Sequence, residues 1–226
     1  MQRHKLFLLF LVATAVLSSC ASTSSGGEPD WVRKTPASRD SVYAVGSTKM
    51  TNEKNSTDAS YGIALTTLSS YLTPFIDDAS SSVSTEETAE AYGTIRSSAV
   101  NAALLSVKKE GVYVSSDETV WTLVSVSVGN LPSLYASAAE DYIVILKGKR
   151  VTTKEKLEDL LKSIEVTPDE NGQPTLSAEA VALKEKAEAK AAEIISGIDS
   201  IESHLEIDTV VEAIRKNLKK AGFKVK

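Results

Sequence analysis

Cysteine and histidine are nearly missing from this sequence, which contains one cysteine and two histidines among 226 residues. A single cysteine cannot form a disulfide within the chain, so the stability of the fold must come from an apolar core. Zinc sites in proteins use three or four ligands, most of them cysteine and histidine, and the chain cannot supply them. We therefore expect neither a disulfide nor a zinc site.

The sequence also lacks the motifs that accompany common catalytic chemistry. It has no Gly-x-Ser-x-Gly, no glycine-rich phosphate loop and no dinucleotide fingerprint. His204 has no acid or base partner that the sequence identifies. The acidic stretches Asp77-Asp78 and 169–172 lack the spaced oxygen ligands of a calcium loop. We therefore predict no catalytic residue, no metal ion and no cofactor, and a protein that is not an enzyme.

Positive charge is in the minority. The whole chain has a formal charge of −5, and residues 1–19 contribute two basic residues and no acidic one, so the remainder has a charge of −7. An acidic body excludes a general affinity for nucleic acid, which binds basic surfaces. It also provides no general attraction to anionic lipid.

The N-terminus has the three parts of a secretory signal. Arg3 and Lys5 supply positive charge, an apolar stretch follows from Leu6 to Leu17, and small residues lead to Cys20. Twelve helical residues span about 18 Å, whereas the hydrocarbon core of a membrane is about 30 Å thick. A cleaved signal sequence over residues 1–19 is therefore a better interpretation than a transmembrane helix.

The sequence Leu17-Ser18-Ser19-Cys20 resembles the lipobox of bacterial lipoproteins, in which the cysteine thiol takes a diacylglyceryl group and the chain is cut just before it. We expect lipidation at Cys20, because two or three acyl chains anchor a protein stably in a membrane. Residues 20–30, rich in serine and glycine, form a flexible tether. This places the chain in the cell envelope, and Ala21 favours the outer over the inner membrane under the sorting rule of many Gram-negative bacteria.

The first half of the body alternates between strand and helix patterns. A strand is predicted over 41–47, and a helix over 56–72 that ends at Pro74. A second helix is predicted from about 85 to 109, with Gly111 as its stop. Residues 112–116 and 119–128 then form a hairpin around Asp117-Glu118. The order predicts an α+β fold in residues 31–128, a small antiparallel sheet with helices packed on one face.

The second half is helical. One helix follows Leu131, and Thr153 opens another, giving a helical extension over 129–166. The sequence TPDENGQP at 167–174 predicts a boundary. Beyond it, residues 177–196 are rich in alanine, and their apolar seam is too short for a coiled coil with a second copy. We therefore predict a C-terminal helical hairpin within 175–226, formed with the helix over 208–221.

Two sets of residues are candidates for surface contacts. The last helix has a basic side, which either contacts anionic lipid or a partner, or is simply solvated while the apolar side faces the core. Solvation is the simpler interpretation. Two tryptophans are candidates for an interface, although the core is the commoner place for them. The candidates are Trp31, Trp121, Arg215, Lys216, Lys219 and Lys220.

The body resembles the LPP20-type bacterial lipoproteins, some of which are associated with flagella. The matching features are Pro29-Asp30-Trp31-Val32, Tyr43-Ala44-Val45-Gly46, the alanine-spaced helix that follows, and the late strand Thr119 to Val124, so the resemblance covers about residues 29–128. The chain departs from the family at Ser47-Thr48, where a second glycine is usual. The resemblance implies an envelope protein without catalytic residues.

Three functions are compatible with these patterns. The first is a membrane-anchored interaction or scaffolding protein of the cell envelope, whose partners are the membrane and an envelope protein. The second is a lipid-anchored binding module that carries a small apolar or envelope-derived ligand. The third, with the least support, is an envelope hydrolase. A flat apolar patch favours the first function, a deep apolar pocket the second, and a close pair of acidic groups the third.

Overall fold

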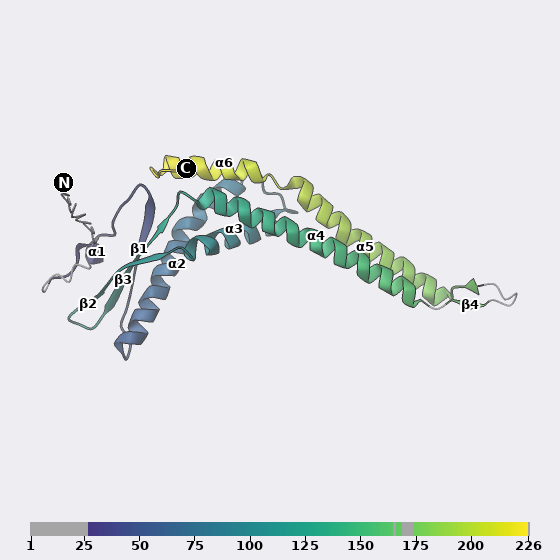
Figure 1. The fold of residues 1–226 in the computed structure, drawn as a ribbon, viewed down its shortest axis with the longest axis horizontal. Coiled ribbons are helices and arrows are strands. Elements are labelled where there is room, and N and C mark those ends of the chain that lie inside the picture. The colour runs from purple at the N-terminus through teal and green to yellow at the C-terminus, as the bar shows by residue number, and fades with distance from the viewer. Residues whose placement is uncertain (1–26, 165, 169–173, 226) are drawn as a thin grey trace, which may run out of the picture.

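The computed structural model describes residues 27–164, 166–168 and 174–225 (Figure 1). The predicted signal sequence (1–19), Cys20 and residues 21–26 of the predicted tether lie outside the described residues. The molecule is elongated, with a small sheet and several helices at one end and a long arm of two helices reaching away from them. Within the described ranges, no helix has the length and apolar character needed to cross a membrane.

The sheet has three antiparallel strands, β1 (Ser41–Thr48), β2 (Lys108–Val114) and β3 (Val120–Ser127), in the order β1-β3-β2. The predicted hairpin is confirmed, and Glu118 in its turn has a φ of 67°. One face of β3 is fully buried. That face consists of Val120, Thr122, Val124 and Val126, none more than 1% exposed.

A long helix packs on one face of this sheet, as predicted, and a single helical turn lies on the other face. The long helix α2 (Glu53–Ser80) packs against the buried face of β3 and against β1. The one-turn helix α1 (Asp30–Arg33) lies on the other face (Figure 1), where the Trp31 ring is 3.4 Å from the place a Cβ on Gly111 would occupy. With the helical C-terminal region, this confirms the predicted α+β class.

Helix α2 is longer than predicted, because it does not end at Pro74. Pro74 is on the exposed side, where the carbonyl that loses its backbone partner can bind water. Continued burial beyond the proline outweighs a cost of about 3 kcal/mol for proline in a helix. The apolar spacing of residues 56–72 suggests that Ile63 and Tyr71 face the core, but both are about half exposed. The buried positions instead recur at every fourth residue, Ser56, Ser60, Ala64, Leu68, Leu72, Ile76 and Ser80, with Ala79 beside them.

Helix α3 (Ala89–Leu104) is shorter than predicted at both ends. Residues 85–88 form a turn, in which the hydroxyl of Thr88 accepts a hydrogen bond from the Thr85 N–H at 2.9 Å. The chain then enters β2 at Lys108, because β3 offers backbone partners there. The prediction of Gly111 as a helix stop was wrong, since it follows a register shift within β2.

The second half forms the arm and then returns to the core. Helix α4 runs unbroken over Leu131–Ser163, so the prediction that Thr153 opens a new helix was wrong. Two short strands, β4 (Thr167–Pro168) and β5 (Pro174–Thr175), connect it to α5 (Ala178–His204), which runs back along α4 (Figure 1).

Helix α6 (Ile207–Lys220) packs on α2 and α4 rather than along α5. The predicted hairpin between the last two helices was therefore wrong. The true partner of α5 is α4, and the antiparallel strands β4 and β5 lie between the two helices in the sequence.

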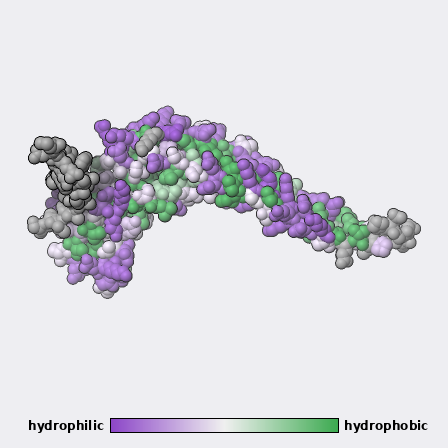
Figure 2. Space-filling model, in the orientation of Figure 1, coloured by the Kyte–Doolittle hydropathy of each residue, from purple (hydrophilic) through white to green (hydrophobic). Residues whose placement is uncertain are grey.

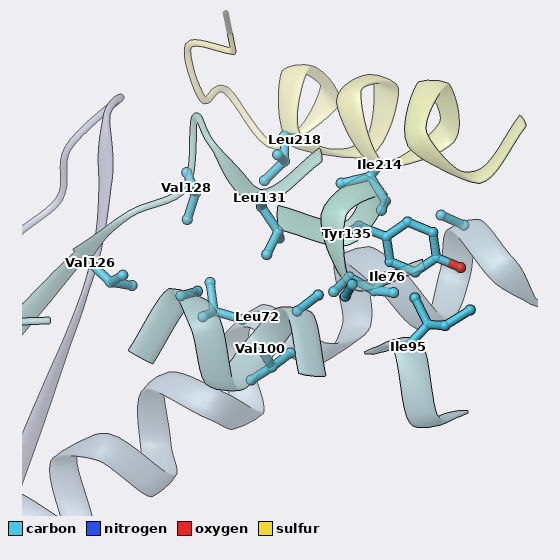
Figure 3. Close-up of a cluster of buried hydrophobic side chains, with 14 of the residues drawn as sticks. Leu72, Ile76, Ile95, Val100, Val126, Val128, Leu131, Tyr135, Ile214 and Leu218 are labelled. Atoms are coloured by element: carbon cyan, nitrogen blue, oxygen red, sulfur yellow. The ribbon is translucent and has the colours of Figure 1, made fainter. Parts of the chain in front are cut away.

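The main core lies where α2, α3, the first half of α4 and α6 meet (Figure 3). Each helix contributes large apolar side chains that are fully or almost fully buried, and together they form one cluster that continues to the buried face of the sheet. Residues 31–128 therefore share their core with the first and last helices of the second half. Examples are Leu72, Ile76, Ile95, Val126, Leu131, Tyr135, Ile214 and Leu218.

Candidate functional site

The arm, defined as residues 146–163 of α4 together with α5, is the most distinctive surface of the molecule. Along α4, side chains that face α5 alternate in steps of four and three, as in a coiled coil. The facing positions of α5 include small alanines, which leave the seam thinly filled. Of the arm's residues, Leu146, Ala191 and Ile198 are buried. The arm therefore has a narrow internal core and apolar groups at its surface.

A shallow groove of about 300 Å³ runs between the two helices of the arm. Its floor is apolar because Leu157 and Leu160 face the alanines of α5. Ile194 lines the groove and is 39% exposed. Leu183, nearer the start of α5, is 48% exposed. Figure 2 shows apolar surface between the hydrophilic side chains of this region. The groove is lined by Thr153, Lys156, Leu157, Leu160, Ala187, Lys190, Ala191 and Ile194.

A charged cluster fixes the two helices of the arm at the end near the core. The Arg150 guanidinium forms ion pairs with Asp199 and with Glu202, the latter at 2.6 Å. The hydrogen bond to Glu202 is the main reason that the pKa of Arg150 is raised above its ordinary value. A paired charge at a seam position favours one alignment of the helices over a slipped one. The groove is therefore held in one register.

The predicted basic side of the last helix is present. The apolar side of α6 faces the core, with Val210, Ile214 and Leu218 fully buried. Arg215 is partly buried and forms an ion pair with Glu212 on its own helix. The other three basic residues of this side are exposed, as expected for the solvated side of an amphipathic helix. They are Lys216, Lys219 and Lys220.

The two tryptophans lie on the side of the sheet that faces away from α2. Trp121 sits in β3 between Ser47 of β1 and Tyr113 of β2, and it is partly exposed. Trp31 reaches the same face from α1 and covers the backbone at Gly111. The structure thus brings both tryptophans to one side of the sheet, where each is partly buried and partly accessible.

A second cavity, larger than the groove on the arm, is polar. It measures about 440 Å³ and lies at the end of the sheet beside the last turn of α3 and the first turn of α4. Hydroxyl and charged groups dominate its wall, and the Ser125 hydroxyl donates a hydrogen bond to the Glu110 carboxylate at 2.5 Å. Such a lining suits water or a polar ligand more than an apolar one. Its polar residues include Ser41, Tyr43, Ser106, Lys108, Glu110, Ser125, Ser127 and Asn130.

Titratable groups are dispersed. The His204 ring nitrogen Nδ1 lies 2.8 Å from the Ser200 carbonyl, so this histidine completes the end of α5. The Tyr135 hydroxyl is buried without a hydrogen-bond partner among the described residues, and burial raises its pKa. No group of three or more His, Cys, Asp or Glu side chains in the described ranges is arranged to hold a metal ion.

The sequence contained a signal for the arm that the predictions above did not use. Residues Leu146, Arg150, Thr153, Leu157 and Leu160 follow the four-three spacing of a coiled-coil seam. The prediction that a new helix begins at Thr153 divided this run into two parts and so hid its spacing. The charged partner of Arg150 lies about 50 residues away in α5, so no local pattern could identify it.

Comparisons with models of known protein families, with curated protein sequences and with solved structures find no match for this chain. The resemblance to LPP20-type lipoproteins therefore stays a prediction from residues 29–128.

Proposed function

We propose that this chain is a lipid-anchored, non-enzymatic interaction protein of the bacterial cell envelope, and that its arm is the part that binds other proteins. The anchor is argued from the lipobox at Cys20 alone. The outer membrane is the proposed location, because Ala21 follows the cysteine.

The observation that carries the binding role is the arm with its apolar groove. Helix α5 has 27 residues, and a helix of that length extends about 40 Å. Two helices that extend away from the core expose more surface than the same residues would in a compact domain. Apolar side chains such as Leu183 and Ile194 remain accessible on it. Exposed apolar surface rimmed by charged groups is typical of protein-binding sites.

The carrier and hydrolase hypotheses have less support. The cavity beside the sheet is polar, which does not suit a small apolar ligand, one of the two ligand classes of the carrier hypothesis. The hydrolase hypothesis calls for a close pair of acidic groups with raised pKa values. At the exposed carboxyl of Asp117, hydrogen bonds from Ser115 and Thr119 lower the pKa instead, to about 2.

Two measurements test the proposal. Intact-mass analysis of protein from membranes of its own host, beside a Cys20→Ala variant, should show a chain that begins at residue 20 and carries two or three acyl chains, with neither feature in the variant. An unmodified mass would contradict the anchor.

The second measurement tests the arm with a photoreactive amino acid in place of Ala187, which lines the groove. The control position is Val151, which is 54% exposed and faces away from α5, because it lies two residues from the seam position Thr153. In intact cells, we expect crosslinked protein from position 187 and none from position 151. Equal crosslinking at both positions, or none at either, would contradict a binding role for the groove.

A further inference from the structure

We propose that the groove on the arm binds the same groove on a second copy of this chain, with the two arms side by side and pointing in the same direction. This inference rests on the proposed function, since it names the partner that the groove binds. A hairpin of two helices leaves an apolar side uncovered. Two such hairpins packed face to face bury both sides in a four-helix bundle.

The area of the groove side is sufficient for a stable dimer. Helices pack at about 10 Å between axes, so two helices side by side present a face about 20 Å wide. The two helices lie side by side over residues 146–163, about 27 Å, and α5 extends to about 40 Å. The face therefore measures roughly 670 Å² per chain, within the range of about 600–1,000 Å² per partner for a standard protein interface. The apolar floor of Leu157 and Leu160, together with Leu183 and Ile194 on α5, would form the centre of that interface.

The charges of the arm select between two arrangements. Residues 146–163 of α4 carry six basic and three acidic residues, whereas α5 carries six acidic and three basic ones. A two-fold axis along the arm places α4 of each copy over α5 of the other. A two-fold axis across the arm places α4 over α4 and α5 over α5. Opposite net charges favour the first arrangement, and like charges disfavour the second.

Lys156 supports the first arrangement in particular. It lines the groove and makes no ion pair with any residue that the structure describes, whereas Lys190 on the other wall is already paired with Glu193 at 2.8 Å. With the axis along the arm, Lys156 lies over the acidic helix α5 of the second copy. With the axis across the arm, it lies over the basic segment of α4.

The same arrangement fits chains that are anchored in one membrane. When both arms point in one direction, the two sheets and the two α1 helices, which follow the tethers, lie at the same end of the dimer. Neither chain has to turn over to reach the other. Anchoring also raises the effective concentration of one chain for its neighbour, which favours an interface of this size.

Cysteine crosslinking in membranes tests both the interface and its orientation. Leu183 is near the tip of the arm, five residues after the start of α5. In a Leu183→Cys variant the two new thiols face each other only when the arms point in the same direction. When the arms are opposed, the thiols lie at opposite ends of the bundle. We expect a dimer with a short bifunctional thiol reagent for Leu183→Cys, and none for Val151→Cys or for the natural chain, whose one cysteine is Cys20.

Sedimentation equilibrium of the full lipidated protein in detergent gives an independent measurement. We expect the natural chain and a Val151→Glu control to sediment as dimers. In the Ile194→Glu variant, each copy places a charge at the edge of the groove, and we expect a dissociation constant raised by at least about tenfold. Circular dichroism should show equal helix content for all three, because Ile194 is already partly exposed.

The outcomes separate this inference from the proposed function. A natural chain that stays monomeric at tens of micromolar, or a Leu183→Cys variant that crosslinks no better than Val151→Cys, would overturn the dimer. If position 187 still crosslinked to a different envelope protein, the interaction function would stand with another partner. Loss of the acyl chains and of all crosslinks at position 187 would overturn the proposed function itself.

Discussion

Gly46 lies directly against the backbone of α2, and substituting it by alanine should destabilise the protein strongly. Gly46 is buried in β1, opposite Thr122 of β3. A Cβ at this position would collide with the Ser60 carbonyl oxygen and would lie 2.5 Å from the Ala64 backbone nitrogen. Both atoms belong to the backbone of α2, so no side-chain rotation can relieve the collision.

The magnitude follows from the displacement required. Carbon and nitrogen atoms pack at about 3.5 Å, so β1 and α2 must separate by about 1 Å. Overpacking of this kind costs about 1–3 kcal/mol. The shift would also stretch the buried hydrogen bond between the Ser60 and Thr122 hydroxyls, which is 2.6 Å long, and its loss adds about 1 kcal/mol. We expect the free energy of unfolding to fall by about 3 kcal/mol.

Equilibrium unfolding in urea, followed by tryptophan fluorescence, measures this change. With a slope of about 2 kcal/mol per molar urea, the midpoint should fall by about 1.5 M. Gly62→Ala provides the control. Gly62 is on the exposed side of α2, and a Cβ there would meet no atom within 4 Å. Gly62→Ala should stabilise the protein by about 0.5–1 kcal/mol. If Gly46→Ala unfolds at or above the natural midpoint, the close approach of β1 to α2 is refuted.

Further predictions concern hydroxyl groups and pH. Tyr135→Phe should leave the free energy of unfolding unchanged or raise it by about 1 kcal/mol, because the lost hydroxyl is buried without a partner. Tyr92→Phe should lower it by about 1–3 kcal/mol, since its hydroxyl accepts a hydrogen bond from the Glu206 N–H at 2.9 Å. A destabilised Tyr135→Phe would reveal a hidden partner for that hydroxyl.

Burial raises the pKa of Tyr135, so the unfolded chain loses this proton first and stability should fall as pH rises above about 10; the fall should be shallower in Tyr135→Phe. The pKa of Asp117, about 2, should move toward 3.8 in Ser115→Ala when measured by NMR titration. Its contribution to stability is present above about pH 4 and is lost as pH falls through 2. An unchanged Asp117 titration would show that the Ser115 hydrogen bond does not form.

Local signals predicted the sheet well. Asp117-Glu118 between two alternating runs was sufficient for the hairpin, and Thr122 continued the buried face of β3 although it is polar. Its burial is possible because its hydroxyl pairs with Ser60 across the sheet–helix interface. The path of α2 was harder to predict, since three of its buried positions are serines. Their hydroxyls bond to backbone carbonyls one turn earlier, as Ser80 does to Ile76 at 3.0 Å, so burial there does not follow hydrophobicity.

Tertiary contacts decided what local patterns could not. Pro74 signals a helix end, but the packing of Ile76 beyond it carries α2 onward. The Ala-rich segment 177–196 fits several neighbours equally well by its sequence. Its pairing with α4 depends on the paired strands β4 and β5 and on Arg150, whose carboxylate partners come from a distant part of the chain. The candidate site on the arm therefore depended on contacts that neither helix reveals alone.

The position of α6 determines when this protein can fold. Asn217 donates a hydrogen bond to the Phe75 carbonyl, 142 residues earlier, and the Lys224 N–H donates one to the Arg39 carbonyl at 2.7 Å. Strand β1 likewise pairs with β3, which comes about 80 residues later in the sequence. Contacts so distant in sequence make folding slow, because loop closure precedes any gain from burial. The core therefore cannot close completely until α6 has left the ribosome.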